Sequence, residues 1–539
     1  LPVERVSTDA DASFITYIIQ FHQALFLGAA SQVQGGSALL VDTVSQYGIM
    51  PIYLLAGLFE FIPIGNGTLS FIDASLSAVV FAAGFVVLRM AGVRLGLAIL
   101  ALAVGVVALV WDTTYPVGGL LQHGALRFGL PMMLIVPFVA AFRWPRLATP
   151  ARLFGLLVVG LSSIWALESF LYVTFSYLGM VAIQIPWQEP GRRIRWTLLR
   201  LLDMVAAWVV IQVVFALVTL AASGSLPQWG LYLSYLRDFL TGDIGDLTYD
   251  FTEWSRGFAV AAIYLASVTG LATLVTRVPE SATARRPAFV ALAGLTFYGV
   301  ALFSYYDNRS LDHVLPYVSL PALLVVTIWL ALLLEPDGPA PMAVRRLGLG
   351  TACVAAALLV AVALPAAAKR SEDSLLAYVI PGGPSLASGF DRLWNPPEFK
   401  PGAIEGERLV NENMPDQEEI AVIAEPDLDV EIVTRTGKPN ALGITDAKEM
   451  SWVFSPHREQ VDKLSGELAP GDLILLDPEA IRAFRYIEAN PEAAPLFEGL
   501  DSSMELVQRR ILNQIAERFT LVKVDSGETG LTVFRLQPR

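Results

Sequence analysis

Residues 35–48 read Gly-Gly-Ser-Ala-Leu-Leu-Val-Asp-Thr-Val-Ser-Gln-Tyr-Gly and stand immediately before the first strongly apolar run, residues 49–61. The segment is rich in hydrogen-bonding groups and contains one acid, Asp42. Non-helical backbone at membrane depth is tolerated only against protein or a water-filled cavity. An acidic side chain in such a place is by default a candidate for function. We therefore expect this loop to belong to a functional site.

The composition predicts a polytopic membrane protein with a soluble part. Of the 539 residues, 54% are hydrophobic and only 16% are charged, and the mean hydropathy is +0.55. Soluble domains are charged at about a quarter of their positions. The net charge of -13 argues against a nucleic-acid partner, which would need a basic face. The single cysteine, Cys353, can form no intrachain disulfide.

The hydrophobic pattern predicts three parts: a first loop with an amphipathic helix (1–45), a transmembrane helical domain (46–367) and a soluble domain (368–539). The chain starts at Leu1 without a signal-like segment, so we expect a preceding helix to be missing. Runs of membrane-spanning length give about ten to eleven candidate helices. They lie near 46–64, 68–88, 94–111, 126–142, 153–186 (counted as two), 197–222, 257–276, 287–304, 313–334 and 346–365.

Four short loops carry clusters of arginine, which predicts that they face the cytoplasm. These are Arg143, Arg146 and Arg152; Arg192, Arg193 and Arg195; Arg277, Arg285 and Arg286; and Arg345 and Arg346. The last helix then exits outward, so the soluble tail is expected on the extracytoplasmic side of the plasma (inner) membrane.

The tail after residue 368 has the pattern of a small α/β domain. Residues 419–424 and 472–477 are short apolar runs next to turn residues, as expected of buried strands. A helical periodicity covers residues 503–518, and two closing strands are expected at 520–524 and 530–536. Strands that alternate with helices indicate an α/β fold.

The first loop also has a recognisable order: a glycine turn, an apolar pair, an acid and then Tyr47-Gly48 before a helix. This order resembles the first extracytoplasmic loop of GT-C-type membrane glycosyltransferases of the arabinosyltransferase or mannosyltransferase kind. The resemblance implies a GT-C-like helical fold and an inverting transfer of a pentose or hexose from a polyprenyl-phosphate donor. The acceptor would be a cell-envelope glycan, lipid or protein. It also places the loop outside, whereas counting every run as a span places Asp42 inside. We therefore expect one early run, such as 46–64 with Glu60 in it, to be re-entrant or not to cross.

Sugar transfer needs a carboxylate that takes the proton of the acceptor hydroxyl. In GT-C-type enzymes this base is an acid at the start of the first loop, and Asp9 or Asp11 matches that order. Asp42 is the other candidate, with the alternative that it caps the next helix or fixes the loop. His22 lies nearer the expected position but is not an acid, so we expect it, with Tyr47, to contact substrate.

Glu168 is the strongest single candidate for a functional residue, because it interrupts an apolar stretch of about thirty residues. A carboxylate in hydrocarbon is costly and must face a cavity or a partner. We expect a catalytic role, with a carboxyl group hydrogen-bonded between helices as the structural alternative.

Candidate phosphate contacts lie in two loops. Arg309 and His313 follow a helix end, and the loop around Arg309 resembles an Arg-Ser loop of related transferases. His123 and Arg127 form the second pair. Arginine suits a phosphate because its planar fork donates two parallel bonds. The alternative for both loops is an ordinary solvated turn.

No spacing of metal ligands is recognisable, so we name no metal-binding residue and no certain cofactor. Related families include members with and without a divalent cation, which leaves that cation open. Two other functions also stay open. The chain could be a transporter or flippase for a lipid-linked glycan, or a structural subunit of a membrane assembly.

Overall fold

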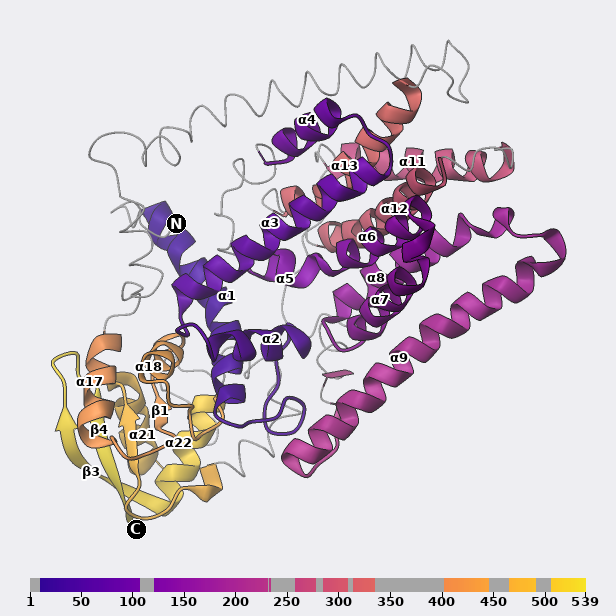
Figure 1. Cartoon of the computed structure of the whole chain (residues 1–539). Helices are drawn as coiled ribbons and strands as arrows, with labels where there is room; N and C mark the ends of the chain where they lie inside the picture. The colour runs from indigo at the N-terminus through magenta and orange to yellow at the C-terminus, as the bar shows by residue number, and fades with distance from the viewer. Residues whose placement is uncertain are drawn as a thin grey trace. The chain divides into compact units, whose positions relative to one another are not determined.

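The computed structural model describes residues 10–106, 121–230, 232–233, 257–277, 285–308, 314–334, 402–444, 465–490 and 506–539. The chain divides into two compact units (Figure 1). Unit 1 holds residues 70–215 and 246–386, and unit 2 holds residues 3–69, 216–245 and 387–539. Each unit therefore combines segments that are far apart in the sequence, so this division does not test the predicted boundaries at 46 and 368.

Among the described residues, six helical segments are long and apolar enough to cross a membrane. They are Asn66–Met90, Leu121–Arg143, Leu167–Trp187, Pro190–Ser223, Arg286–Asp307 and Tyr317–Leu334. Met50–Phe59, Leu95–Val106 and Gly257–Thr273 are shorter apolar helices. Helix α2, Met50–Phe59, is about 15 Å long, half the hydrocarbon thickness of about 30 Å. Whether the run at 46–64 crosses the membrane stays a prediction. The run at 346–365 lies outside the described residues.

Helix α12 (Arg286–Asn308) forms the centre of unit 1. It packs against α6 (Leu130–Arg143), α8 (Leu167–Ala182), α11 (Gly257–Arg277) and α13 (Leu315–Leu334). Small residues allow the close approach: a Cβ on Gly179 would collide with the ring of Phe297, and a Cβ on Gly299 with the ring of Tyr264. Membrane helices commonly pack through such positions, because lipid supplies no hydrophobic force between them.

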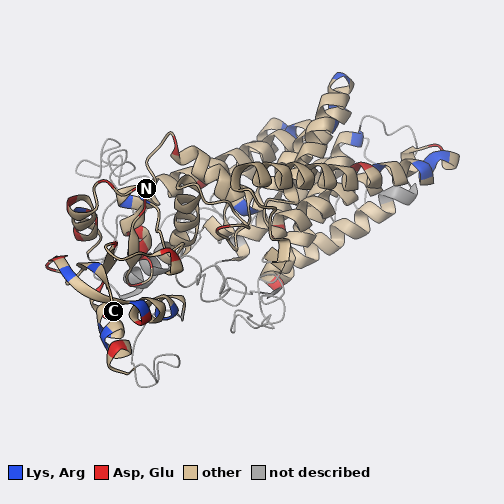
Figure 2. Cartoon of the chain, turned by 90° about the horizontal axis from the view of Figure 1, so that it is seen from below, with Lys and Arg blue, Asp and Glu red and all other residues tan. Residues whose placement is uncertain are grey.

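Helices α7 (Ala148–Ser162) and α9 (Arg193–Ser223) lie at the outside of the helical part. Leucine and valine side chains are exposed along α9, among them Leu202, Val209 and Leu217, each more than half exposed. Figure 2 shows the helices mostly without charged residues, with Lys and Arg gathered mainly near helix ends. Such surfaces suit contact with lipid tails rather than with water.

Unit 2 contains a four-stranded sheet in the order β1-β2-β4-β3. The strands are β1 (Ala421–Ile423), β2 (Leu473–Leu476), β3 (Phe519–Ser526) and β4 (Thr532–Pro538). Strands β1 and β2 are parallel, and the pairs β2–β4 and β3–β4 are antiparallel. All four predicted strands and the predicted helix, α22 (Leu506–Arg518), are therefore present.

Side chains alternate between the two faces of this sheet, as strand geometry requires. Ile423 and Ile474 belong to a core formed with α21 (Pro478–Ala489) and α22. Val422 and Leu475 belong to a second core, formed with α17 (Ala403–Asn413) and α18 (Leu428–Thr436). The predicted fold class, a polytopic helical protein with a C-terminal α/β domain, is thus confirmed by the apolar helices and by this sheet.

The N-terminal helix α1 (Ala10–Gln34) packs against α2 and α18 inside unit 2. At its end the buried Gln32 side chain donates from Nε2 to the carbonyl of Asn440 over 3.1 Å. Gly35 lies against the ring of Pro439, where a Cβ would have no room. The first loop therefore rests on the C-terminal α/β domain.

Candidate functional site

A one-turn helix, α5 (Ala125–Phe128), lies between the 3-10 turn Leu121–His123 and helix α6 in unit 1. Side chains from other elements hold three of its backbone carbonyls. Trp165 donates from Nε1 to Leu126 O over 2.7 Å, Tyr298 donates its hydroxyl to Phe128 O over 2.6 Å, and Ser169 donates to Arg127 O. Backbone groups away from water must find partners inside the protein. These bonds fix the turn through side chains of α8, of the loop before α8 and of α12.

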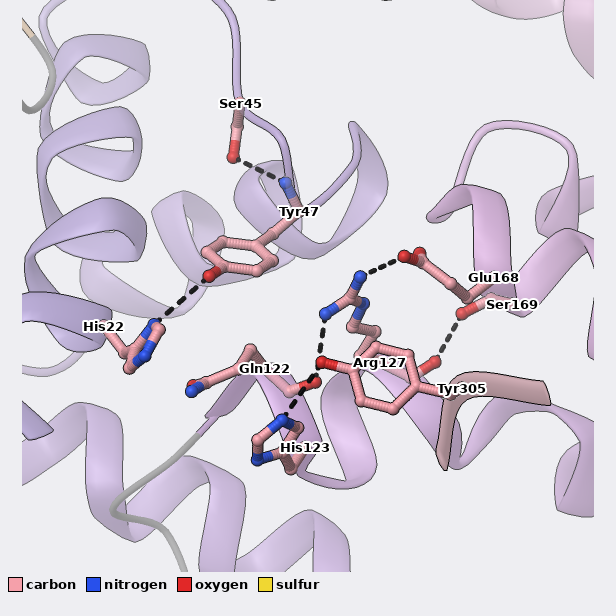
Figure 3. Close-up of polar contacts among 9 residues, drawn as sticks. All are labelled: His22, Ser45, Tyr47, Gln122, His123, Arg127, Glu168, Ser169 and Tyr305. Carbon is pink, nitrogen blue, oxygen red and sulfur yellow. Dashed lines mark hydrogen bonds and ion pairs between the residues drawn. The ribbon is translucent and has the colours of Figure 1, made fainter. Parts of the chain in front are cut away.

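This turn presents Arg127, whose side chain is only 9% exposed although it is charged. Its Nη2 forms an ion pair with Glu168 Oε1, and its Nη1 donates to the carbonyl of Gln122 over 3.2 Å (Figure 3). The guanidinium carbon lies 5.4 Å from the centre of the Tyr305 ring, a cation–π distance. Arg127 is therefore held in one orientation by contacts on several sides.

Glu168 lies in the first turn of α8. A carboxylate there also gains from the positive end of the helix dipole. Its side chain is 21% exposed, against 9% for Arg127, so the carboxylate is the more accessible member of the pair. The sequence predicted that this acid needs a partner, and that partner is Arg127, 41 residues earlier in the chain. Whether Glu168 takes part in catalysis stays a prediction.

His123 is buried beside the same turn, and its Nε2 lies 3.0 Å from the hydroxyl of Tyr305. Its ring also contacts the rings of Tyr305 and Tyr317, with centres 5.5 and 5.4 Å away. Tyr305 therefore touches both His123 and Arg127 (Figure 3). The second pair of predicted phosphate contacts, His123 and Arg127, is thus brought together with Glu168 around one tyrosine.

A second polar group belongs to unit 2. His22 Nδ1 lies 3.3 Å from the hydroxyl of Tyr47, and the Tyr47 ring stacks on Phe26 with centres 4.4 Å apart. The backbone N–H of Tyr47 donates to Ser45 Oγ over 3.2 Å (Figure 3). The structure therefore pairs the two first-loop residues that we predicted as substrate contacts.

The predicted bases differ in how much of each residue the structure describes. Asp42 accepts a hydrogen bond from the backbone N–H of Ala38 over 2.8 Å through Oδ2, so it fixes its own loop, as the structural alternative stated. Asp11 lies in α1, and only its helical backbone is described. Asp9 lies outside the described residues, as do Arg309 and His313. The roles of all these residues stay predictions.

The sequence reasoning missed one acidic residue of the site, Asp73 in α3 (Asn66–Met90). It is 1% exposed, and its Oδ1 accepts from the backbone N–H of Leu126 over 3.5 Å. The signal was present, because Asp73 is an acid inside the apolar run 68–88, the same pattern that identified Glu168.

Within the part of the chain that the structure describes, no group of three or more His, Cys, Asp or Glu side chains could hold a metal ion. The described site consists of one arginine, one partly buried carboxylate, one fully buried carboxylate, a histidine and a tyrosine. Such a set can bind an anion and exchange a proton, since a rigid arginine fork suits phosphate and a carboxylate can accept a proton.

No family model matches the sequence, and a comparison with curated proteins found no similar one. A comparison with solved structures found ArnT from Cupriavidus metallidurans, in a crystal structure bound to undecaprenyl phosphate. The match has 14% sequence identity and a TM-score of 0.43, and it covers 97% of this chain and 96% of that chain. The apo structure of ArnT gives 14% identity, a TM-score of 0.40 and the same two coverages. At these identities and TM-scores, neither the activity nor the ligand of ArnT is carried over to this chain.

Proposed function

We propose that this chain is an inverting membrane glycosyltransferase that takes a sugar from a polyprenyl-phosphate donor. The observation that carries the proposal is the buried arginine Arg127, held at a fixed turn among membrane helices beside the more exposed carboxylate of Glu168. The resemblance of residues 35–48 to the first loop of GT-C-type enzymes supports the same function. The acceptor would be a glycan, lipid or protein of the cell envelope, reached on the outer side of the membrane.

The chemistry explains why a fixed arginine is needed. The acceptor oxygen forms a bond to the anomeric carbon of the sugar while the bond from that carbon to the phosphate oxygen breaks. The leaving polyprenyl phosphate gains negative charge, and the acceptor hydroxyl loses its proton to a carboxylate. A cation already in place where charge develops stabilises the transition state without reorganisation. Arg127 has this preorganisation, because its fork is bound to Glu168 and to the carbonyl of Gln122.

We assign the proton-accepting role to a carboxylate among Asp9, Asp11, Asp42 and Glu168. Of the two whose side chains are described, Asp42 is engaged with the backbone of Ala38. Glu168 is engaged with Arg127. Arg309 and His313 remain proposed contacts of the donor phosphate, and His22 with Tyr47 a proposed contact of substrate.

The test is sugar transfer by the full chain in proteoliposomes, with a panel of polyprenyl-phosphate pentoses and hexoses that carry a labelled sugar and an envelope extract as acceptor. Arg127→Ala should lower the transfer rate about 100- to 1000-fold, the effect of losing one transition-state charge contact. Arg127→Lys should recover only part of the loss, since an ammonium group cannot span Glu168 and Gln122 at once.

Arg152→Ala is the matched control, because Arg152 is an exposed arginine whose partner is Asp203. It should transfer sugar at the wild-type rate. Wild-type transfer by a folded Arg127→Ala variant would remove Arg127 from the site.

A transporter or flippase for a lipid-linked glycan is the second candidate, because buried ion pairs between membrane helices also serve as coupling groups. The two functions separate in the same vesicles. A transferase moves the labelled sugar to a new acceptor. A flippase moves the intact labelled lipid across the bilayer and makes no new glycosidic bond.

A further inference from the structure

Asp73 is an acidic residue in the interior of an apolar helix. It lies in α3, in a segment long and apolar enough to span a membrane, and it is only 1% exposed. Such a group is expensive to bury and requires a hydrogen-bonding partner inside the protein. The partner therefore shows what Asp73 does.

That partner is the amide side of the α5 turn. Asp73 Oδ1 accepts from the N–H of Leu126 over 3.5 Å, and the N–H of Ala125 also faces this carboxylate. The adjacent residue, Gly124, has no Cβ, and a Cβ at that position would collide with both carboxylate oxygens. Glycine is thus required here for close approach of a side chain to the backbone.

The side chains around the α5 turn therefore bind both kinds of backbone group, its carbonyl oxygens and an amide N–H. Trp165, Ser169 and Tyr298 hold carbonyls, while Asp73 holds the amide of Leu126. Leu126 directly precedes Arg127. A shift of the turn by about 1 Å would displace the guanidinium by a similar amount, and misplacements of that size can cost about 100-fold in rate.

We propose that Asp73 is a positioning residue for Arg127, which acts through the backbone of the α5 turn in the space that Gly124 leaves open. This role rests on the proposed function to the extent that Arg127 acts on substrate. The structural half of the proposal, that Asp73 fixes the turn, is independent of it.

The first experiment measures transfer by full-length chain in proteoliposomes. Asp73→Ala should lower the transfer rate about 10- to 100-fold. Asp73→Asn, which keeps the volume and one acceptor oxygen, should lower it less, and it replaces the alanine variant if that one does not fold. In the Arg127→Lys background, where the fork is already lost, Asp73→Asn should add less than about a 2-fold loss.

The control is Asp203→Asn, which makes the same chemical change at a carboxylate paired with Arg152 and Arg200. It should leave transfer unchanged in both backgrounds. If Asp73→Asn lowers transfer by the same factor with and without Arg127, then Asp73 supports the general fold and the positioning role is wrong.

The second experiment does not depend on activity. Hydrogen exchange of the full chain should show the amides of Ala125 and Leu126 exchanging about 10-fold faster in Asp73→Ala than in wild type, the factor expected for one lost hydrogen bond. Unchanged exchange would overturn the proposal. If wild type transfers sugar from no donor while exchange still responds as expected, the proposed function fails and the role of Asp73 in fixing the turn stands.

Discussion

Two short segments, the α5 turn with Arg127 and the first loop with Tyr47, are held in different ways. The α5 turn in unit 1 is fixed by side chains from α3, α8, α12 and the loop before α8. The first loop in unit 2 is fixed mainly by its own backbone: Leu40 N–H donates to Thr43 O and Asp42 N–H donates to Ala38 O, each over 2.8 Å. The difference follows from the surroundings, because a turn among membrane helices has no water to satisfy its backbone.

This comparison implies different sensitivities to mutation. The α5 turn depends on groups that are buried and charged, so the loss of one partner leaves another without compensation. The first loop depends on many short local bonds and on contacts with the α/β domain. We therefore expect the largest effects in unit 1, intermediate effects where the first loop meets the tail, and the smallest effects inside the loop itself.

The largest effect should come from Glu168→Ala, because it leaves the buried guanidinium of Arg127 without its counter-ion. Removing one member of a buried pair costs about 3–5 kcal/mol. Glu168→Gln can still accept a hydrogen bond and should shift the melting temperature less, while it removes most transfer if the negative charge is needed. The measurement is thermal unfolding beside the transfer rate. Asp203→Ala, which breaks partly exposed pairs with Arg152 and Arg200, should cost about 1 kcal/mol or less for each pair; an equal loss in both variants would break the comparison.

An intermediate effect is expected from Asn440→Ala, at the contact between the tail and α1. The Asn440 side chain donates to Val422 O over 3.0 Å and accepts from the N–H of Val422 and of Leu442, so it acts as a partner along one side of β1. Its loss leaves buried peptide groups unsatisfied, which costs about 1–3 kcal/mol. We expect a lower melting temperature of the full chain. Asn490→Ala, which removes an exposed amide at the end of α21, is the control and should change little.

The smallest effect should come from Tyr47→Phe. It removes the contact with His22 and keeps the ring that stacks on Phe26. One hydrogen bond contributes about 0.5–1.5 kcal/mol net, so the melting temperature should fall only slightly. Tyr47→Ala, which also removes the stacked ring, should cost clearly more. A large loss in the phenylalanine variant would show that the first loop depends on single buried groups as the α5 turn does.

The elements that the sequence predicted best are those encoded by local patterns. The strands at 421–423 and 473–476 follow short apolar runs, and α22 follows its helical periodicity. Glu168 was identifiable because an acid stands alone in an apolar stretch. Local pattern was sufficient in these places because the burial of each element follows directly from its own residues.

The partners of the site could not be predicted in the same way. Arg127 and Glu168 are 41 positions apart, and Asp73 and Leu126 are 53 positions apart. Their contacts depend on how α3, α5 and α8 pack, which depends on small residues and crossing angles rather than on any one segment. For Asp42 the sequence left a base and a loop-fixing residue as alternatives, and the structure describes the loop-fixing bond without testing the first role.

The distribution of charge along helix α9 indicates at which depth the helix would lie in a bilayer. All the charged residues of α9 lie in the first eleven of its 31 residues. They are Arg193, Arg195, Arg200 and Asp203. The remaining residues, 204–223, carry no charge and extend about 30 Å, which equals the hydrocarbon thickness of a typical membrane. We therefore expect residues 204–223 to span the hydrocarbon layer of the membrane. Asp203, with Arg152 and Arg200 bound to it, would then lie at one boundary of that layer. A thinner membrane would be met by tilt of this helix.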